Sequence, residues 1–210
     1  MKNDVKGPWS LKKLKYLATI NDEALPETTD PEYEISYIDI GNVRSNGLVE
    51  PPTTYRFADA PSRARRLVKN GDVIISTVRT YLQAIASIEN PPENLIVSTG
   101  FAVVRANPEN LNVNFCKYVL RESSFLSELE KRSVGVSYPA INSSDLGDIV
   151  LKIPPISTQR RVADYLDRET ARIDKLIETA ELSIVLLKER RVAVISAAVT
   201  GKIDIDNYEN

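Results

Sequence analysis

Histidine is absent from the sequence of 210 residues, cysteine occurs once, and no apolar run approaches the length of about 18 residues that a membrane span needs. Without histidine the chain cannot form a Ser-His or Cys-His nucleophile or a His-ligated metal site. Cys116 cannot close a disulfide within the chain, and the N-terminal MKNDVKGPWS lacks the apolar segment of a secretory signal. These absences predict a protein of the reducing cytoplasm with no membrane partner.

Sequence motifs for cofactor chemistry are also missing. The chain has no GxGxxG motif, no Walker phosphate loop and no paired cysteines for zinc, and its carboxylates show no spacing that singles out a catalytic pair. Lys and Arg number 27 against 29 Asp and Glu, so the net charge is −2 and any site for a polyanion must be local. The composition favours binding over catalysis. A self-contained nuclease or methyltransferase would need a metal or cofactor site that the sequence does not offer.

Short runs of β-branched residues, separated by turn residues such as Asn70-Gly71 and Pro91-Pro92, fill the chain up to Ile153. They predict strands at residues 34–40, 72–78, 84–88, 95–98, 101–105 and 149–153. Strands that follow one another so closely indicate a largely antiparallel sheet or barrel.

Residues 112–132 differ, because their apolar side chains recur at helical spacing behind Asn112, which is a suitable N-cap. We expect one or two helices here, packed on the sheet. The predicted fold class is therefore α+β: a β-rich domain with packed helices over residues 1–155, followed by a long coiled-coil helix and tail over residues 156–210.

Positive charge is concentrated in two places within the β-rich domain. Residues 56–81 carry an excess of four positive charges, which could form a track for phosphates. Lys131 and Arg132 precede the loop SVGVSYPAIN, whose hydroxyl and aromatic groups could contact bases or phosphates. The simpler interpretation is that the arginines form a solvated face and the loop is only a turn. The candidate DNA contacts are Arg63, Arg65, Arg66, Arg79, Lys131, Arg132, Ser137 and Tyr138.

The last quarter of the sequence predicts one very long helix. Pro154 and Pro155 keep the incoming chain extended, and Thr158 or Ser157 can cap the first turn. No glycine or proline then occurs until Gly201, which is a suitable C-terminal stop. About 40 helical residues would make a rod of roughly 60 Å, longer than the domain that it leaves.

This helix carries an apolar stripe with a seven-residue repeat and a second set of positions four residues further on. The stripe consists of Leu166, Ile173, Ile177, Ala180, Ile184, Leu187 and Val194. Because a stripe of this length exceeds a domain of modest diameter, we expect its outer part to pack against a second helix in a coiled coil. The alternative, a helix packed along its own domain, is less favoured on length alone, although Ala180 and Thr170 make the stripe imperfect.

Several segments, taken in order, resemble the specificity subunits of type I restriction-modification enzymes. "PPISTQRRVADYLDRETARIDKLI" and "LLKERRVAVISAAVTGKI" are similar to that family's spacer helix. "GDVIISTVR", "VSTGFAVVR" and "YPAINSSDLGDIVLKIPP" resemble the strands and closing loop of its target-recognition domain. The resemblance covers nearly the whole chain, and the ordered set is more specific than any one segment.

The resemblance implies a non-catalytic subunit that binds double-stranded DNA. In this family the recognition domain reads one half of a split sequence and the helix sets the distance to the other half. The resemblance also implies that separate methyltransferase (M) and restriction (R) subunits are partners. S-adenosylmethionine, ATP and Mg are then expected only on those partners, with no cofactor on this chain. A different class of function, a coiled-coil scaffold for protein interactions, is the alternative.

Two features depart from the family pattern. Thr158-Gln159 stands where the family usually has Glu-Gln, which slightly weakens the interaction with the helix dipole. The larger departure is length, because a typical member has two recognition domains and two spacer helices. The chain is either a fragment or a natural half-subunit. For a half-subunit we expect a homodimer with antiparallel helices, whose two-fold symmetry requires an interrupted palindrome as target.

Overall fold

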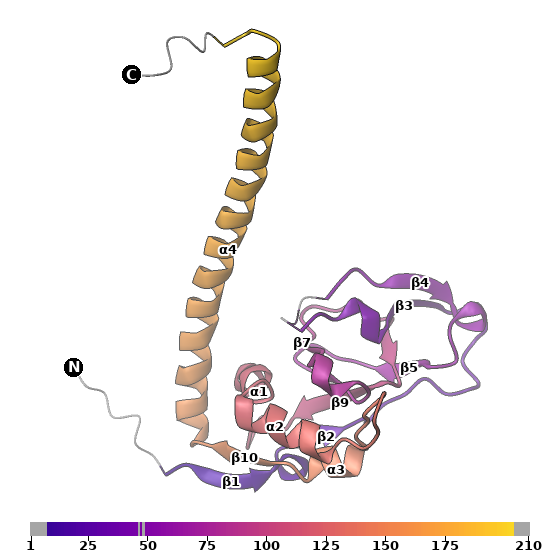
Figure 1. Cartoon of the computed structure of the whole chain (residues 1–210). Helices are drawn as coiled ribbons and strands as arrows, with labels where there is room; N and C mark the ends of the chain where they lie inside the picture. The colour runs from indigo at the N-terminus through magenta and orange to yellow at the C-terminus, as the bar shows by residue number, and fades with distance from the viewer. Residues whose placement is uncertain (1–7, 46, 48, 204–210) are drawn as a thin grey trace. The chain divides into compact units, whose positions relative to one another are not determined.

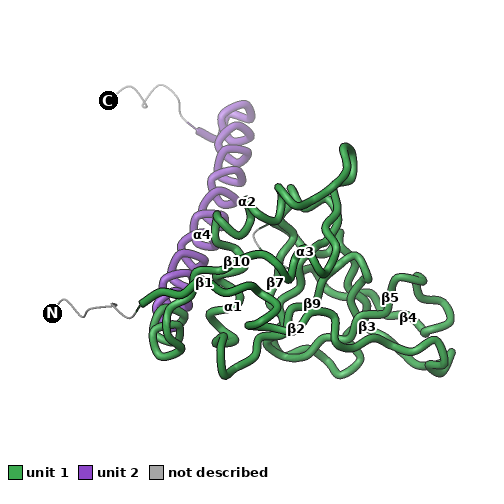
Figure 2. Tube along the Cα trace, turned by 90° about the horizontal axis from the view of Figure 1, so that it is seen from below, with its two compact units in different colours: residues 1–163 green, residues 164–210 purple. Residues whose placement is uncertain are grey.

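The computed structural model describes residues 8–45, 47 and 49–203, and the chain divides into two compact units, Met1–Ala163 and Asp164–Asn210 (Figure 2). The first unit contains the described strands and short helices, and the second consists mainly of one long helix (Figure 1). The predicted α+β fold, with a β-rich part followed by a long C-terminal helix, is confirmed.

The strands of the first unit form two four-stranded sheets and one two-stranded sheet. The central sheet has the order β2 (Ala18–Ile20), β9 (Phe101–Ala106), β6 (Val73–Ser76), β7 (Ile85–Ser87). The outer sheet has the order β4 (Thr53–Arg56), β3 (Glu34–Ile38), β8 (Leu95–Ser98), β5 (Ala64–Leu67). The third sheet pairs β1 (Ser10–Lys13) with β10 (Val150–Ile153). Neighbouring strands are antiparallel, apart from the parallel pair β3 and β8.

The two inner strands of the central sheet, β6 and β9, are buried on both faces, which explains why most of their side chains are apolar. Successive side chains of a strand point to opposite faces. Val73 and Ile75 of β6 accordingly belong to one core, whereas Ile74 belongs to a second core on the other face. On β9, Ala102 joins the first core and Phe101 the second. The first core lies between the central sheet and the short helices, and the second includes residues of the outer sheet.

Helices α1 (Val113–Val119), α2 (Ser123–Arg132) and α3 (Ser143–Gly147) contribute to the first core. Residues 112–132 thus form two helices, which resolves the choice between one and two. The predicted N-cap is confirmed: Asn112 Oδ1 accepts a hydrogen bond from the Phe115 amide at 3.0 Å. The 3₁₀ helices are η1 (Leu14–Tyr16), η2 (Ile40–Asn42), η3 (Phe57–Asp59) and η4 (Thr80–Leu82).

Each of the six predicted strands is present, but most are shorter than expected. β3 ends at Ile38 because the Asp39 side chain caps the following η2. The sequence failed to predict β1, β2, β4 and β5, whose residues are polar or lack a clear alternation. The last three lie at the edges of their sheets, where polar and charged side chains are tolerated and suppress pairing with other chains.

Helix α4 (Ile156–Val199) begins earlier than predicted, so the prediction of Thr158 or Ser157 as N-cap is wrong. The carbonyl of Pro155 accepts from the amides of Thr158 and Gln159, at 2.9 and 3.0 Å, and starts the helix. The predicted end is confirmed. Gly201 has φ of +68°, and the Lys202 amide donates to the Ala197 carbonyl at 2.9 Å, which closes the last turn.

The single cysteine tests the packing of α1. Burial raises the pKa of the Cys116 thiol to about 12, and the side chain is fully buried in the first core. Because the thiolate is the reactive form, we expect the native chain to be inert to a thiol reagent at pH 8 and to label one thiol per chain in guanidinium. The measurement is the rate of thiol labelling with and without denaturant. Fast labelling of the native chain would contradict this packing.

Candidate nucleic-acid interface

A hollow of about 820 Å³ lies in the first unit, where segments distant in the sequence meet. Its lining comes from residues 39–43, 77–84 and 98–100, together with Arg63 and Tyr138. Residues 98–100 form the turn at which the chain passes from β8 of the outer sheet to β9 of the central sheet. The hollow is therefore positioned by both sheets and brings together three of the eight predicted DNA contacts: Arg63, Arg79 and Tyr138.

Arg63 is fixed on one wall of the hollow. Its carbonyl accepts from the Thr99 amide at 2.8 Å, and its Nε donates to the Tyr37 hydroxyl at 3.2 Å. Its guanidinium also pairs with Asp39. The hydrogen bond with Tyr37, and then the interaction with Asp39, raises the pKa of the Arg63 guanidinium. Arg63 is thus a positive charge in a defined position, partly balanced by one carboxylate.

Arg79 and Tyr138 form a stacked pair at the rim. The guanidinium carbon of Arg79 lies 4.5 Å from the centroid of the Tyr138 ring, within the range of a cation–π interaction. The Arg79 amide donates to the Pro139 carbonyl at 2.7 Å, which ties the two segments together through their backbones as well. Arginine and aromatic side chains are both common among the groups that contact nucleic acids, so this pair makes the hollow a candidate nucleic-acid site.

Tyr138 belongs to a loop, residues 133–141, that is held in a defined conformation. Val134 and Ala140 exchange backbone hydrogen bonds of 2.8 and 3.0 Å, which closes the loop as a hairpin. Its base is joined to η4 by a 2.7 Å hydrogen bond from the Thr80 hydroxyl to Ser133. Gly135 has φ of +123°, a conformation in which a Cβ would lie 3.0 Å from the Tyr138 carbonyl oxygen, so the turn requires glycine.

This loop and the adjacent η4 expose large apolar side chains. Val136 is 101% exposed and Val134 is 78% exposed, and Tyr81 and Leu82 of η4 are also exposed. This loop and η4 are therefore a candidate contact surface. They enlarge the candidate site beyond its charged residues.

Two of the remaining predicted contacts lie on β5. Arg65 packs on the face of Phe57, with its guanidinium carbon 4.6 Å from the ring centroid, and donates to the Ala64 carbonyl. Arg66 is half-buried, and burial lowers the pKa of its guanidinium. Its Nε is buried without a hydrogen-bond partner in the part of the chain that the structure describes. Neither residue lines the hollow.

The other predicted contacts lie in and beyond α2. Lys131 Nζ and Arg132 Nε both pair with Glu128, at 3.1 and 3.4 Å. Glu130 lies in the same turn, so the two basic side chains at the end of α2 are balanced by two acidic ones. Ser137 is exposed in the loop beside Tyr138.

Sequence reasoning missed the polar floor of the hollow. Thr77 donates through its hydroxyl to the Gly100 carbonyl at 2.9 Å, and Ser98 and Thr99 lie at the same turn. Asp39 was also missed, although it holds Arg63 and caps η2. These residue types are common in turns, so nothing in their local sequence distinguishes them from ordinary loop residues.

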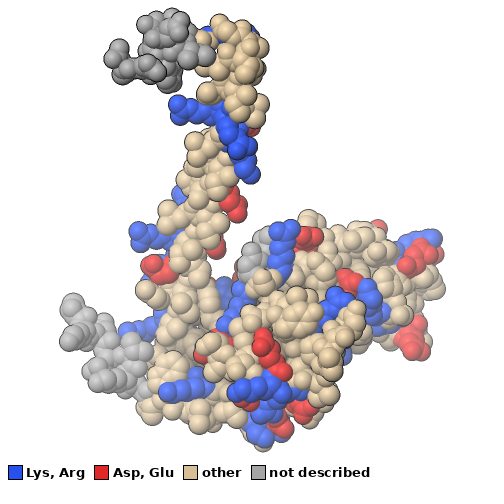
Figure 3. Space-filling view, in the orientation of Figure 1, with Lys and Arg blue, Asp and Glu red and all other residues tan. Residues whose placement is uncertain are grey.

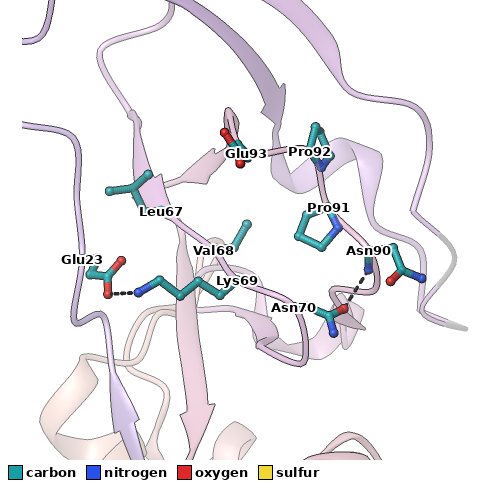
Figure 4. A pocket seen from close by; sticks show the side chains of 9 residues that line it. All are labelled: Glu23, Leu67, Val68, Lys69, Asn70, Asn90, Pro91, Pro92 and Glu93. Atoms are coloured by element: carbon teal, nitrogen blue, oxygen red, sulfur yellow. Dashed lines mark hydrogen bonds and ion pairs between the residues drawn. The ribbon is translucent and has the colours of Figure 1, made fainter.

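A second hollow of about 630 Å³ has a different chemical character (Figure 4). Among the residues that line this hollow, Lys69 is the one basic residue, and it is paired with Glu23. Figure 4 shows Pro91 and Pro92 on the side opposite this pair. The hydrogen bond from Lys69 lowers the pKa of Glu23. With Glu93 also in the lining, this hollow is poorly suited to a phosphate backbone, so the Arg63–Arg79 hollow is the better candidate.

The face of the molecule shown in Figure 3 does not favour either sign of charge. Basic and acidic side chains are interspersed over the face shown in Figure 3. Any attraction for a polyanion must therefore arise from a local site such as the hollow.

Within the described part of the chain, none of the helices combines the length and hydropathy needed to cross a membrane.

An antiparallel central sheet, a mixed outer sheet, a hollow with basic and aromatic residues and a long C-terminal helix are the features to compare with known DNA-specificity proteins. The chain belongs to the family of type I restriction modification DNA specificity domains, whose model matches residues 6–184.

Curated relatives of the chain are specificity subunits. The type I restriction enzyme EcoBI specificity subunit of Escherichia coli is 28% identical over 173 residues, which cover 68% of this chain and 36% of that protein. The MjaVIII specificity subunit of Methanocaldococcus jannaschii is 22% identical over 209 residues, covering 97% of this chain and 48% of the relative. The chain thus spans about one third to one half of the length of these relatives.

Solved structures show the same fold. The HsdS subunit from Thermoanaerobacter tengcongensis superimposes with a TM-score of 0.70 and 29% identity, covering 80% of this chain and 43% of that one. A second structure, described as the basis of complex assembly and conformational transition of the type I R-M system, superimposes with a TM-score of 0.74 and 29% identity. The match covers 92% of this chain and 50% of that one.

Proposed function

We propose that this chain is a non-catalytic DNA-reading subunit of a cytoplasmic type I restriction-modification system, or half of one. The first unit, Met1–Ala163, is then the recognition unit. It contacts one half of a split duplex target at the hollow that Arg63, Arg79 and Tyr138 line. The observation that carries this proposal is the convergence of two arginines and one exposed aromatic ring, from three separate segments, on one concave surface. Phosphate contacts by arginine would position the DNA, and contacts to base edges would select its sequence.

We further propose that a second copy covers the apolar stripe of α4. Residues 171–196 are exposed throughout, including Ile173 and Leu187 of the stripe. A continuous row of exposed apolar side chains calls for a partner helix of the same length, which a second copy supplies. An antiparallel pair related by two-fold symmetry would direct the two recognition units at an interrupted palindrome. The dimer and the coiled coil stay predictions.

A second apolar surface on α4 supports the docking of the M and R subunits. At about 3.6 residues per turn, Leu182 and Leu186 lie on the side opposite Ile184, and Val185 and Val192 lie on the flank between the two sides. The corresponding side of residues 164–181 is polar or charged, with Asp164, Lys175 and Glu178 among its members. Leu182 and Leu186 thus give the C-terminal half of α4 exposed apolar groups away from the stripe, where we propose that a partner subunit packs. S-adenosylmethionine, ATP and Mg would be bound by those partners.

DNA binding is tested by its salt dependence. The probe is a duplex selected from random sequences by the full chain with the M subunit of its own system. If about six phosphates are contacted, affinity should fall about a thousand-fold between 50 and 200 mM salt. Arg63→Gln should reduce the affinity and lower the slope of log K against log salt by about 0.9. Fluorescence anisotropy at several salt concentrations measures both.

The matched control is Arg56→Gln, because Arg56 is exposed, lies outside the hollow and already pairs with Glu32 and Asp59. It should leave the salt slope unchanged. An affinity that is independent of salt would favour the protein-interaction scaffold over DNA recognition. DNA cleavage by the purified chain would contradict the non-catalytic role.

A further inference from the structure

The two arginines of the hollow differ in how much of their hydrogen-bonding capacity is used. Arg63 donates to Tyr37 and pairs with Asp39. The exposed guanidinium of Arg79 makes no hydrogen bond or ion pair with any residue that the structure describes, although it stacks on Tyr138. Because the fork of N–H donors is free and lines a hollow, Arg79 can bind an external pair of acceptors.

Arg79 also has an unusual backbone conformation for a surface arginine. Its backbone is left-handed, with φ of 51° and ψ of 49°, which a residue with a side chain rarely adopts. Gln83, at the other end of η4, has φ of 50°. Such strain persists where the surrounding structure imposes it, and it is concentrated at functional sites. The hydrogen bond to Pro139 and the stack on Tyr138 supply that constraint.

We infer that Arg79 is a specificity-determining residue that reads the O6 and N7 edge of one guanine in the major groove, and that Tyr138 is its positioning residue. The inference deepens the proposed function and rests on it. The planar fork of arginine matches these two acceptors, and this bidentate pair is the commonest base-specific contact. Stacking on Tyr138 covers one face of the guanidinium and leaves its donor edge free. The rigid backbone reduces the entropy that the contact costs.

A phosphate contact is the simpler role for Arg79, and lysine separates the two. Lysine keeps the charge that a phosphate needs but lacks the planar fork. On the selected duplex, Arg79→Lys should lower affinity about tenfold or more, remove the preference for G·C at one position and leave the salt slope unchanged. In the wild-type chain, replacing that one guanine by 7-deazaguanine, which lacks N7, should weaken binding. Arg79→Lys should be insensitive to the same replacement.

The matched pair of variants for the positioning role is Tyr138→Phe and Tyr138→Leu. Phenylalanine keeps the ring and should preserve the guanine preference, whereas leucine removes the ring and should weaken the preference at the same base pair as Arg79→Lys. Unchanged thermal unfolding of each variant shows that the domain still folds.

The inference is overturned if the selected half-site contains no G·C pair, if 7-deazaguanine has no effect at any position, or if Arg79→Lys retains the wild-type sequence preference. Each of these results leaves salt-dependent binding to DNA intact, so the proposed function would survive. Failure to select any duplex, by contrast, would contradict the proposed function itself.

Discussion

Replacing Leu187 by aspartate is expected to convert the chain from a dimer into a monomer at micromolar concentration. In the proposed two-fold arrangement each substitution occurs twice. Losing two buried leucines costs about 4 kcal/mol, so self-association should weaken about a thousand-fold, and the two unpaired carboxylates would add to this loss. Light scattering or sedimentation over a concentration series measures the effect. Ile173→Asp should act in the same direction, because Ile173 belongs to the same stripe.

The matched control is Ala171→Asp, which introduces the same charge on the polar side of α4, nearly opposite Ile173. It should leave the dimer intact. Thermal unfolding of the recognition unit should be unchanged in both variants, because Leu187 belongs to the second unit. A wild-type chain that is monomeric without a partner would count against the half-subunit dimer. Loss of the recognition unit's fold together with the dimer would contradict the modular organisation.

Replacing Gln159 by leucine should cost about 2–4 kcal/mol of folding free energy, because it leaves buried polar groups without partners. Gln159 is 1% exposed at the beginning of α4. Its Nε2 donates to the carbonyls of Pro154 and Asn110, at 2.9 and 3.1 Å, and its Oε1 accepts from the Asn112 amide at 2.8 Å. One side chain thereby joins the start of α4 to the loop that precedes α1. Chemical denaturation of the recognition unit measures the loss.

Two further variants show whether hydrogen bonding is the cause. Gln159→Glu keeps the acceptor and the size but removes both donors and buries a carboxyl, so it should be at least as destabilising as leucine. Arg160→Leu changes an exposed neighbour on the same turn and should have little effect. If Gln159→Leu were as mild as Arg160→Leu, the network would have no role in stability.

The position of Gln159 also illustrates what a resemblance can and cannot supply. The sequence placed a glutamine behind two prolines at the start of the predicted helix, in a pattern similar to a known family. Only the structure reveals that both ends of its amide bond to backbone groups of another loop. A local pattern marks such a residue, but it does not identify its partners.

The sequence by itself determined the elements that depend on near neighbours. β-Branched runs predicted the buried strands, Asn112 predicted the start of α1, and Gly201 predicted the end of α4. Each of these depends on backbone conformation within one turn or one strand, where side-chain shape and local hydrogen bonding decide the outcome. The length of α4 and its apolar stripe follow from the same short-range rules.

Only the tertiary structure decided which residues meet. Arg63, Arg79 and Tyr138 come from segments far apart in the chain, and they line one hollow because β8 and β9 carry the chain between two sheets. Arg66 belongs to the same basic segment as Arg63, residues 56–81, but it is half-buried and does not line the hollow. Along a strand successive side chains point to opposite faces, and which face is covered depends on the pairing of strands distant in sequence. Charge density along the chain therefore identified the region of the candidate site, and strand pairing decided which charges reach it.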